Sequence, residues 1–292
     1  MLKNNPLVSV IINCYNGEKY LREAIDSVIN QTYDNWEIIF WDNQSTDSTA
    51  EIVRGYNDSR IHYFYAVNHT TLGEARNLAV EKANGEYINF LDVDDIWDVD
   101  KLKEQIEIVQ LEHNLVVYTP FEIIVEQGVD KVMQRNYNRI RKIHRKEDHI
   151  YKDLLKHNFI IFSSVLFKKE LYEKIGGINN TFQQNEDYEL LLKCALLSDF
   201  STTKISKTYY RIHKANNSIT NGIIGLYENR EIFNGLPDSK EQRKAIYYNE
   251  ARIGYFMILN EKKYISGIKH ILNESRLKCL LNLIVCKIDS YF

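Results

Sequence analysis

Short apolar runs alternate with segments of helical spacing between Val8 and Leu91. The run from Val8 to Ile12 is rich in β-branched residues, and beyond Gly17 apolar residues recur three and four positions apart, as on one face of a helix over 21–29. The same patterns predict further strands at 37–41, 61–66 and 87–91 and helices at 50–56 and 72–83. Such alternation is typical of a mostly parallel sheet flanked by helices on both faces. We therefore predict an α/β, Rossmann-like fold whose ligands bind beyond the carboxyl ends of the strands.

Beyond Lys101 the alternation loosens. The patterns predict strands within 115–125, at 160–167 and at 202–212, an amphipathic helix at 186–197, and helices from residue 223 to the C-terminus. The division indicates an α/β domain over 1–222 and a small α-helical region over 223–292.

A dense acidic cluster follows the strand predicted at 87–91. Five carboxylates fall within nine residues, at Asp92, Asp94, Asp95, Asp98 and Asp100. Repulsion at that density is unfavourable unless a cation or water compensates it. Carboxylates suit Mg²⁺ or Mn²⁺, which bind one or two of them together with substrate phosphates. Asp98 and Asp100 also fit a cap for a helix that starts near residue 101, so Asp94 and Asp95 are the metal candidates.

Composition excludes several classes of protein. The chain is 44% hydrophobic and 26% charged with a net charge of −3, which excludes a disordered or fibrous protein. No apolar stretch approaches the roughly 20 residues that span a bilayer, and no segment resembles a signal peptide. Four cysteines without a C-x-x-C pair favour a reducing compartment. We expect a cytoplasmic protein, with peripheral contact at the inner face of the membrane as one option.

Five motifs occur in a fixed order, and together they resemble the family 2 glycosyltransferases of GT-A fold. The motifs are Val8 to Asn16, Ser27 to Tyr33, Trp41 to Asp47, Gly73 to Asn77 and Leu91 to Asp95. A weaker resemblance continues through Asn185-Glu186-Asp187 and Tyr210 to His213, so that about residues 7–220 are covered. The resemblance implies an inverting transfer of a sugar from a nucleotide diphosphate donor, with Mn²⁺ or Mg²⁺ on the diphosphate.

On the donor side the resemblance implies roles for five residues. Asn13 and Tyr15 would hold the base and ribose, with the Tyr15 ring available for stacking. Asp42 and Asn43 stand where the family usually has two acids, and the Asn43 carbonyl oxygen still accepts a hydrogen bond from a uracil-type N–H. Arg76 would approach the base or diphosphate, and a surface ion pair is its alternative.

The same resemblance implies a metal site. Asp92 and Asp94 would contact the nucleotide sugar, with Asp94 on the ribose or the metal, and Asp95 would be the main metal ligand. His213 would reach the metal or the diphosphate, although a single histidine more often has a structural role.

An inverting displacement also needs a base for the acceptor hydroxyl. Asp187 matches the family's acidic pair and is the candidate, with a helix N-terminal acid as the alternative. Glu186 and Trp97 are expected on the acceptor side, where Trp97 would stack on a sugar or else cover the core.

Two basic regions have no place in these motifs. The stretch 131–146 holds seven basic residues and no acid, and we interpret it as a loop that meets phosphate on the acceptor or as a solvated loop without a partner. From Lys240 onward ten basic residues face five acidic ones, which leaves −8 on residues 1–239 and disfavours nucleic acid as a partner. The predicted C-terminal helices carry an apolar stripe that suits packing on the first domain, a homo-oligomer or an anionic membrane surface, and it comprises Tyr247, Tyr248, Ala251, Tyr255, Phe256 and Leu259.

The sequence therefore predicts a metal-dependent inverting glycosyltransferase that uses a UDP-sugar and acts on a glycan or lipid-linked acceptor. We expect a nucleotide-binding half at about 1–100 and an acceptor-binding half at about 101–222. Two alternatives stay open. A nucleotidyltransferase shares the acidic metal site but normally needs a Gly-rich basic phosphate loop, which 13–20 is not. A non-catalytic nucleotide- or sugar-binding module would not need Asp187.

Overall fold

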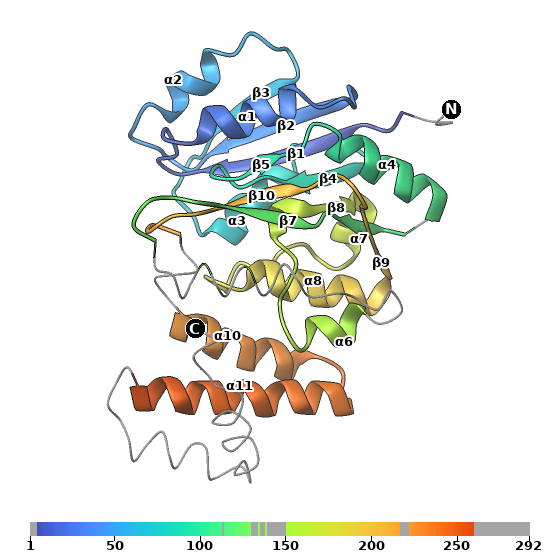
Figure 1. The fold of residues 1–292 in the computed structure, drawn as a ribbon. Coiled ribbons are helices and arrows are strands. Elements are labelled where there is room, and N and C mark those ends of the chain that lie inside the picture. Colours follow the sequence, from blue (N-terminus) through green and yellow to red (C-terminus); the bar gives the residue numbers. More distant parts are fainter. Residues whose placement is uncertain are drawn as a thin grey trace.

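The computed structural model describes residues 5–112, 114–129, 150–216 and 222–259, together with Gln134 and Asn138. Strands and helices alternate in the first part as predicted (Figure 1). They are β1 (Val8–Cys14), α1 (Leu21–Ile29), β2 (Trp36–Asp42), α2 (Thr49–Arg54), β3 (Ile61–Tyr65), α3 (Leu72–Val80) and β4 (Tyr87–Phe90). Then come β5 (Ile96–Trp97), α4 (Lys101–Glu112), β6 (Val116–Tyr118), β7 (Phe121–Val125), α6 (Ile150–Leu154), the 3₁₀ turn η1 (Phe162–Ser164), β8 (Val165–Lys168), α7 (Lys169–Lys174), α8 (Glu186–Leu197), β9 (Phe200–Thr202), β10 (Thr208–Ile212), α10 (Gly222–Gly235) and α11 (Lys240–Leu259).

The main sheet has seven strands in the order β3-β2-β1-β4-β8-β6-β9. The pairs β3–β2, β2–β1, β1–β4 and β6–β9 are parallel, whereas β8 is antiparallel to both of its neighbours. Val8 at the start of β1 lies opposite Trp36 of β2 on one side and Tyr87 of β4 on the other. The predicted mostly parallel sheet is therefore confirmed.

Both faces of this sheet are covered. Val8, Val10 and Ile12 of β1 pack in one core with α1, α2 and α4, and Ile11 between them packs in a second core with α3 and α8. Because a strand buried on both faces presents apolar residues at every position, its sequence is a continuous apolar run rather than an alternating one.

A second, three-stranded sheet has the order β5-β10-β7. Its existence corrects the prediction of one strand over 202–212, because the segment holds only Thr202, the last residue of β9 in the main sheet, and then β10 in the second sheet. The break comes where the Glu104 carboxylate accepts the backbone N–H groups of Lys204, Ile205 and Ser206. The strand predicted at 160–167 is also shorter than expected, because its middle forms the turn η1 and only Val165–Lys168 is strand.

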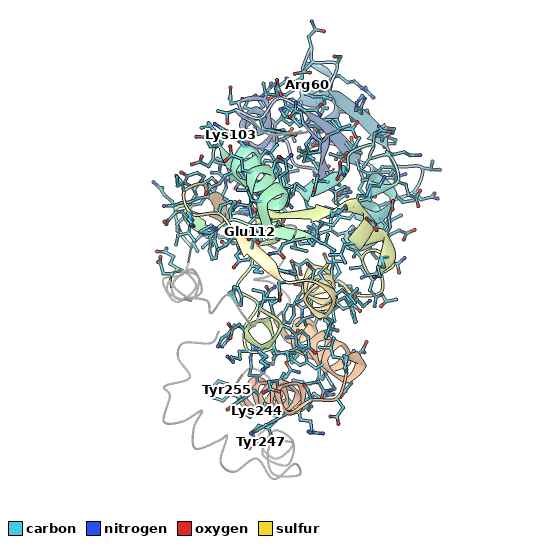
Figure 2. All side chains as sticks on the ribbon, turned by 90° about the vertical axis from the view of Figure 1, so that its right-hand side faces the viewer. Arg60, Lys103, Glu112, Lys244, Tyr247 and Tyr255 are labelled. Atoms are coloured by element: carbon cyan, nitrogen blue, oxygen red, sulfur yellow. The ribbon has the colours of Figure 1, made fainter. Side chains whose placement is uncertain are left out.

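The helices α10 and α11 lie at the end of the molecule farthest from α2, beneath α6 and α8 (Figure 1). Figure 2 shows Tyr247 and Tyr255 of α11 at this end, opposite Arg60. The predicted apolar stripe is wrong in part, because Tyr248 is 50% exposed. The buried face of α11 instead includes polar residues that bind α10, such as Gln242, which donates to the Phe233 carbonyl, and Asn249, which donates to the Leu226 carbonyl.

Several predictions concern residues outside the described part of the chain. Most of the basic stretch 131–146 lies there, as does every residue beyond 259. Among the helices that the structure describes, none has the length and apolarity to cross a bilayer.

Candidate active site

Strand pairing in the second sheet brings the acidic cluster to His213. β5 begins directly after Asp95 and runs antiparallel to β10, with Ile96 opposite Tyr209. Beyond this pair, the Arg211 N–H donates to Asp95 Oδ1 at 3.0 Å, and Arg211 Nε donates to the Asp94 carbonyl oxygen at 2.9 Å. Beyond the end of β10, His213 Nε2 lies 2.9 Å from Asp94 Oδ2.

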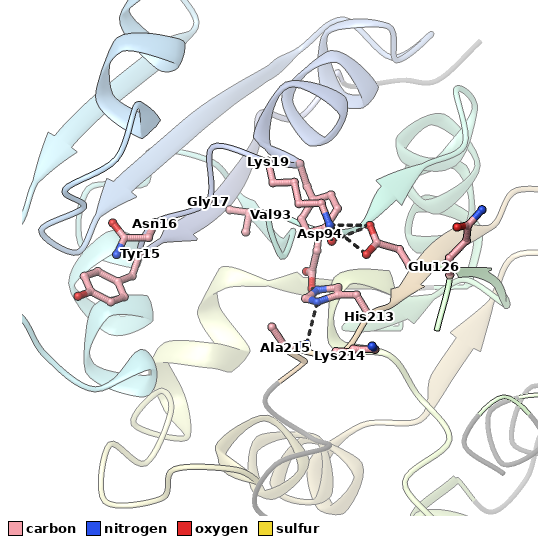
Figure 3. A pocket seen from close by; sticks show the side chains of 12 residues that line it. Tyr15, Asn16, Gly17, Lys19, Val93, Asp94, Glu126, His213, Lys214 and Ala215 are labelled. Atoms are coloured by element: carbon pink, nitrogen blue, oxygen red, sulfur yellow. Dashed lines mark hydrogen bonds and ion pairs between the residues drawn. The ribbon is translucent and has the colours of Figure 1, made fainter. Parts of the chain in front are cut away.

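Asp94 and His213 line a pocket of about 480 Å³ (Figure 3). It opens beside the loop that follows β1, and its lining comprises Tyr15, Asn16, Gly17, Lys19, Tyr20, Val93, Asp94, Glu126, Gln127, His213, Lys214 and Ala215. Gly17 belongs to the tightest part of this loop, because a Cβ atom there would stand 2.5 Å from Cys14 Sγ. Both Asp94 and His213 keep part of their side chains accessible to a ligand.

A second polar group lines the same pocket. Glu126 accepts hydrogen bonds from Lys19 Nζ at 3.0 Å and from the Tyr20 hydroxyl at 2.7 Å. The Tyr20 ring lies 5.1 Å from the His213 ring and 4.9 Å from the Arg211 guanidinium, so it packs between the two. None of Lys19, Tyr20, Glu126 and Arg211 was predicted as a site residue. Glu126 follows β7 directly, which is the same signal that identified the acids after β4.

Asp94 and Asp95 have different surroundings. Asp95 has no exposed surface, and burial, followed by the charges of Asp94 and Asp92, raises the pKa of its carboxyl well above the usual value. Its Oδ2 atom has no hydrogen-bond partner within the described residues. The expectation that Asp95 is the main metal ligand is therefore not met by its position, since Asp94 is the acid that reaches the pocket. Asp95 instead fixes the backbone of β10 just before His213.

Arg76 is buried, with 4% of its surface exposed, so the alternative of a surface ion pair is wrong. Its Nη2 atom lies 2.7 Å from Asp92 Oδ1 and its Nη1 atom 2.9 Å from Glu186 Oε1, while the guanidinium packs 4.7 Å from the centroid of the Phe162 ring. Arg76 thus joins α3 to the acidic turn and to α8. Glu186 is also buried, so in this structure it supports Arg76 rather than facing an acceptor.

Asp187 lies in the first turn of α8, next to this network. Burial and, secondarily, the charge of Glu186 raise the pKa of its carboxyl to about 7, against the opposing effect of Arg76. Its Oδ1 atom accepts the Tyr188 N–H at 2.6 Å. A carboxylate whose pKa lies near neutral pH is well matched to proton transfer.

The predicted base-binding residues differ in accessibility. Tyr15 is 55% exposed and meets the edge of the His69 ring at 4.6 Å between centroids. Asn13 places its Nδ2 atom in the interior, where no partner for it occurs among the described side chains and backbone. Both oxygens of Asp42 are engaged, by the Ser45 N–H and the Tyr63 hydroxyl.

Asn43 and Trp97 are also engaged within the protein. The Asn43 carboxamide donates to the Thr70 carbonyl and accepts from the Thr70 N–H, so in this structure it holds a loop instead of an open position for a base edge. Trp97 is 2% exposed, donates from Nε1 to the Ser163 carbonyl, and has the Lys101 Nζ atom 3.8 Å from its ring centroid. The sugar platform expected of Trp97 is therefore absent here, and the ring covers the core.

The strand order, together with the acidic turn at the carboxyl ends of the parallel strands, defines a nucleotide-binding α/β fold of the GT-A type. Residues 9–176 match the model of glycosyl transferase family 2. The chain belongs to this family and is a glycosyltransferase.

Curated relatives span most of the chain. The Bacillus subtilis glycosyltransferase TuaG, named for teichuronic acid biosynthesis, is 33% identical over 220 residues, which are 74% of this chain and 82% of the relative. The Escherichia coli UDP-Glc:alpha-D-GlcNAc-diphosphoundecaprenol beta-1,3-glucosyltransferase WfgD is 29% identical over 234 residues, which are 71% of this chain and 91% of the relative.

Two solved structures share the fold at low identity. S. aureus TarS in complex with UDP-GlcNAc aligns with a TM-score of 0.65 and 20% identity, over 92% of this chain and 77% of that one. The Pyrobaculum calidifontis mannosyltransferase PcManGT in complex with GDP-Man and Mn²⁺ aligns with a TM-score of 0.64 and 18% identity, over 97% of this chain and 81% of that one.

Proposed function

We propose that the chain is a metal-dependent, inverting glycosyltransferase that moves a sugar from a UDP-sugar to a hydroxyl of a glycan or lipid-linked acceptor, in bacterial-type surface polysaccharide or glycoconjugate synthesis. The observation that carries the proposal is the placement of two acidic pairs around Arg76. Arg76 binds Asp92, which lies two residues before Asp94 of the pocket, and Glu186, which lies next to Asp187, whose pKa is about 7.

The names of the relatives support the substrate classes. One relative is named for teichuronic acid biosynthesis, and the name of another states a UDP-glucose donor and a diphosphoundecaprenol-linked acceptor. A structure of the same fold holds UDP-GlcNAc. In the proposed division residues 1–222 form the catalytic domain, with the donor bound by about 1–100 and the acceptor by about 101–222, and 223–292 form a helical region.

The side chains that could bind a metal at the pocket fit a divalent cation. Asp94 supplies a carboxylate and His213 an imidazole nitrogen, and within the described residues no group of three or more His, Cys, Asp or Glu side chains could enclose a metal. Mg²⁺ and Mn²⁺ suit such an open site, since substrate phosphates and water complete their coordination. When bound, the cation would neutralise charge on the leaving diphosphate. Asp95 accepts the Arg211 N–H and would thereby hold the end of β10 from which His213 extends. Asn216 donates to the Asp94 carboxylate and would hold that side chain in place.

Asp187 would act as the base. In an inverting displacement the acceptor hydroxyl loses its proton as its oxygen attacks from the face opposite the leaving group, and a carboxylate on the acceptor side takes that proton. The carboxylate form of Asp187 is available at neutral pH because its pKa is about 7, and the same pKa favours its accepting a proton in the reaction. Tyr15, exposed at the edge of the pocket, would stack on the donor base.

The decisive experiment incubates the protein with UDP- and GDP-sugars and Mn²⁺, with and without lipid-linked and oligosaccharide acceptors. Acceptor-dependent release of nucleoside diphosphate supports the proposal. In a parallel incubation with a nucleoside triphosphate and a sugar phosphate, release of pyrophosphate would indicate a nucleotidyltransferase. Binding of UDP without turnover of any donor would indicate a non-catalytic module. D187N should still bind UDP with Mn²⁺ but lose transfer, and full activity of this variant would remove Asp187 from the mechanism.

A further inference from the structure

A carboxylate of α10 binds the segment that precedes the proposed base. Glu228 is 8% exposed and accepts three backbone N–H groups in succession, from Gln183 at 2.6 Å, Gln184 at 3.0 Å and Asn185 at 2.9 Å. These residues lead directly into α8, which begins at Glu186. The C-terminal helical region therefore contacts the catalytic domain at the residues next to Asp187 (Figure 1).

Asn185 adds a second connection to α10. It is the N-cap residue of α8, yet its side chain makes no capping hydrogen bond. Its carboxamide donates instead to the Gly225 carbonyl at 2.7 Å and to Asn229 Oδ1 at 3.0 Å, both on α10. Gly225 allows this close approach, because a Cβ atom there would lie 3.3 Å from Asn185 Nδ2.

The physical reason for this arrangement lies in the start of α8. The first N–H groups of a helix have no partner inside the helix, and the N-terminus carries partial positive charge. Hydrogen bonds from N–H groups to a carboxylate are short and strong, so Glu228 satisfies the N–H of the N-cap residue Asn185 and those of the two residues before it, and its charge beside the N-terminus offsets the helix dipole. Glu228 thereby fixes the path of the chain from Gln183 to Asn185, and with it the direction from which Asp187 enters the site.

We propose that Glu228 is a positioning residue for the transfer reaction, which acts by holding the Gln183–Asn185 segment so that Asp187 meets the acceptor hydroxyl. The inference rests on the proposed role of Asp187 as the base. Under this proposal α10 contributes to catalysis through Glu228, in addition to packing on the catalytic domain. Donor binding at Asp94 and His213 lies on other elements and does not depend on this contact.

The chain offers a matched control on the same helix pair. Arg230 of α10 binds Glu250 of α11 through Nε at 2.5 Å and Nη2 at 2.7 Å, and Glu250 is as buried as Glu228. The Arg230–Glu250 ion pair joins α10 to α11, and neither residue belongs to the Gln183–Asn185 segment. E250Q therefore loosens the helix pair without removing the carboxylate from the start of α8.

The test compares E228A, E228D, E250Q and D187N with the nucleotide sugar that the panel above identifies. A misplacement of catalytic groups by about 1 Å costs about 100-fold, so we expect E228A to lower kcat by about 10- to 100-fold and to leave the donor KM and the Kd of UDP with Mn²⁺ within about twofold. E228D keeps the charge and should recover part of the loss, and E250Q should keep the kcat of the unaltered protein. Hydrogen exchange at the amides of Gln183, Gln184 and Asn185 should accelerate in E228A and less in E228D.

Combining E228A with D187N separates the two proposals. If Glu228 acts through Asp187, the double variant is no slower than D187N alone. An E228A variant with unaltered kcat, or one whose donor affinity falls as much as its kcat, overturns the inference and leaves the proposed function standing. A fully active D187N, or a panel without turnover, overturns the proposed function and this inference with it. If E228A does not fold, unchanged kcat and unchanged amide exchange in E228D overturn the inference.

Discussion

Asp94 Oδ2 and His213 Nε2 lie 2.9 Å apart although 119 residues separate them in the chain. The contact depends on the pairing of β5 with β10, which places the acidic turn beside the end of β10. Asn216 binds both residues, since it donates to the Asp94 carboxylate and accepts the His213 N–H, so the two side chains form a preorganised site. This preorganisation makes the roles of Asp94 and Asp95 separable by mutation.

D94N should weaken Mn²⁺ binding in the presence of UDP by at least about tenfold, because it replaces the pocket-facing carboxylate with a poor ligand for a hard cation. D95N alters a fully buried group that does not reach the pocket, so its effect on Mn²⁺ affinity should be smaller. Thermal melting with UDP, with and without Mn²⁺, measures both. A larger loss in D95N than in D94N would reverse this assignment.

The pH dependence of the reaction should report Asp187. The base must be ionised, so kcat/KM should fall as the pH drops through about 7, by about tenfold for each further pH unit. Because the Glu186 charge contributes to the raised pKa of Asp187, E186Q should shift this limb to lower pH. A limb that stays in place in E186Q would show that another group controls it.

The same raised pKa predicts an effect on stability. A carboxyl whose folded pKa exceeds its unfolded value binds more protons when folded, so its contribution to the free energy of unfolding falls as the pH rises from about 4 to about 7. D187N removes this cost, and the variant should be more stable than the unaltered protein at pH 8 by an amount on the order of a few kcal/mol. At pH 4 the difference should be small. Urea unfolding at the two pH values checks the sign.

Removing Arg76 should destabilise the fold. Its guanidinium is buried between Asp92 and Glu186, so R76M leaves two carboxylates without their cation, at a cost of about 3–5 kcal/mol in the free energy of unfolding. Combining R76M with E186Q removes the more deeply buried of the two charges and should recover part of that loss. If R76M unfolds in urea like the unaltered protein, the network contributes nothing to stability.

Tyr15 should affect donor binding through its ring alone. Its hydroxyl is not needed for stacking, so Y15F should leave the donor KM unchanged, and Y15A should raise it by about 3- to 10-fold, which corresponds to an aromatic contact of about 0.5–1.5 kcal/mol. Initial rates at varied donor concentration measure the effect. An equal rise in both variants would point to the hydroxyl instead.

The sequence predicted the first part of the fold well because its strands are buried on both faces. A strand such as β1 is then a continuous apolar run that is hard to mistake. The second sheet was missed because β5 has two residues, too few for any periodic pattern, and because the break between β9 and β10 depends on Glu104, which lies about a hundred residues away in the chain. Contacts of that kind leave no local signal.

For the candidate site, the sequence predicted the acidic motifs but not the contacts that orient them. The acids after β4 and the pair Glu186-Asp187 stood out as motifs, but Asp94 and Asp95 lie in a turn, where sequence alone does not tell which of the two side chains is buried. The burial of Arg76 and the hydrogen bonds that Glu228 accepts depend on tertiary contacts between segments that are distant in the chain. The position of Glu126 after β7, by contrast, could have been noted from the sequence.

The reversed direction of β8 has a consequence for how this chain tolerates change in length. Because β8 runs against β4, its first residues lie beside the end of β4, and the turn η1 reaches the acidic turn, where Ser163 Oγ accepts the Asp92 N–H. A residue inserted just before Ser163 would displace that support beneath Asp92. An insertion just after Lys168 would fall at the opposite edge of the sheet, away from the chemistry. Length variation among natural homologues should therefore concentrate behind β8 and avoid the turn in front of it.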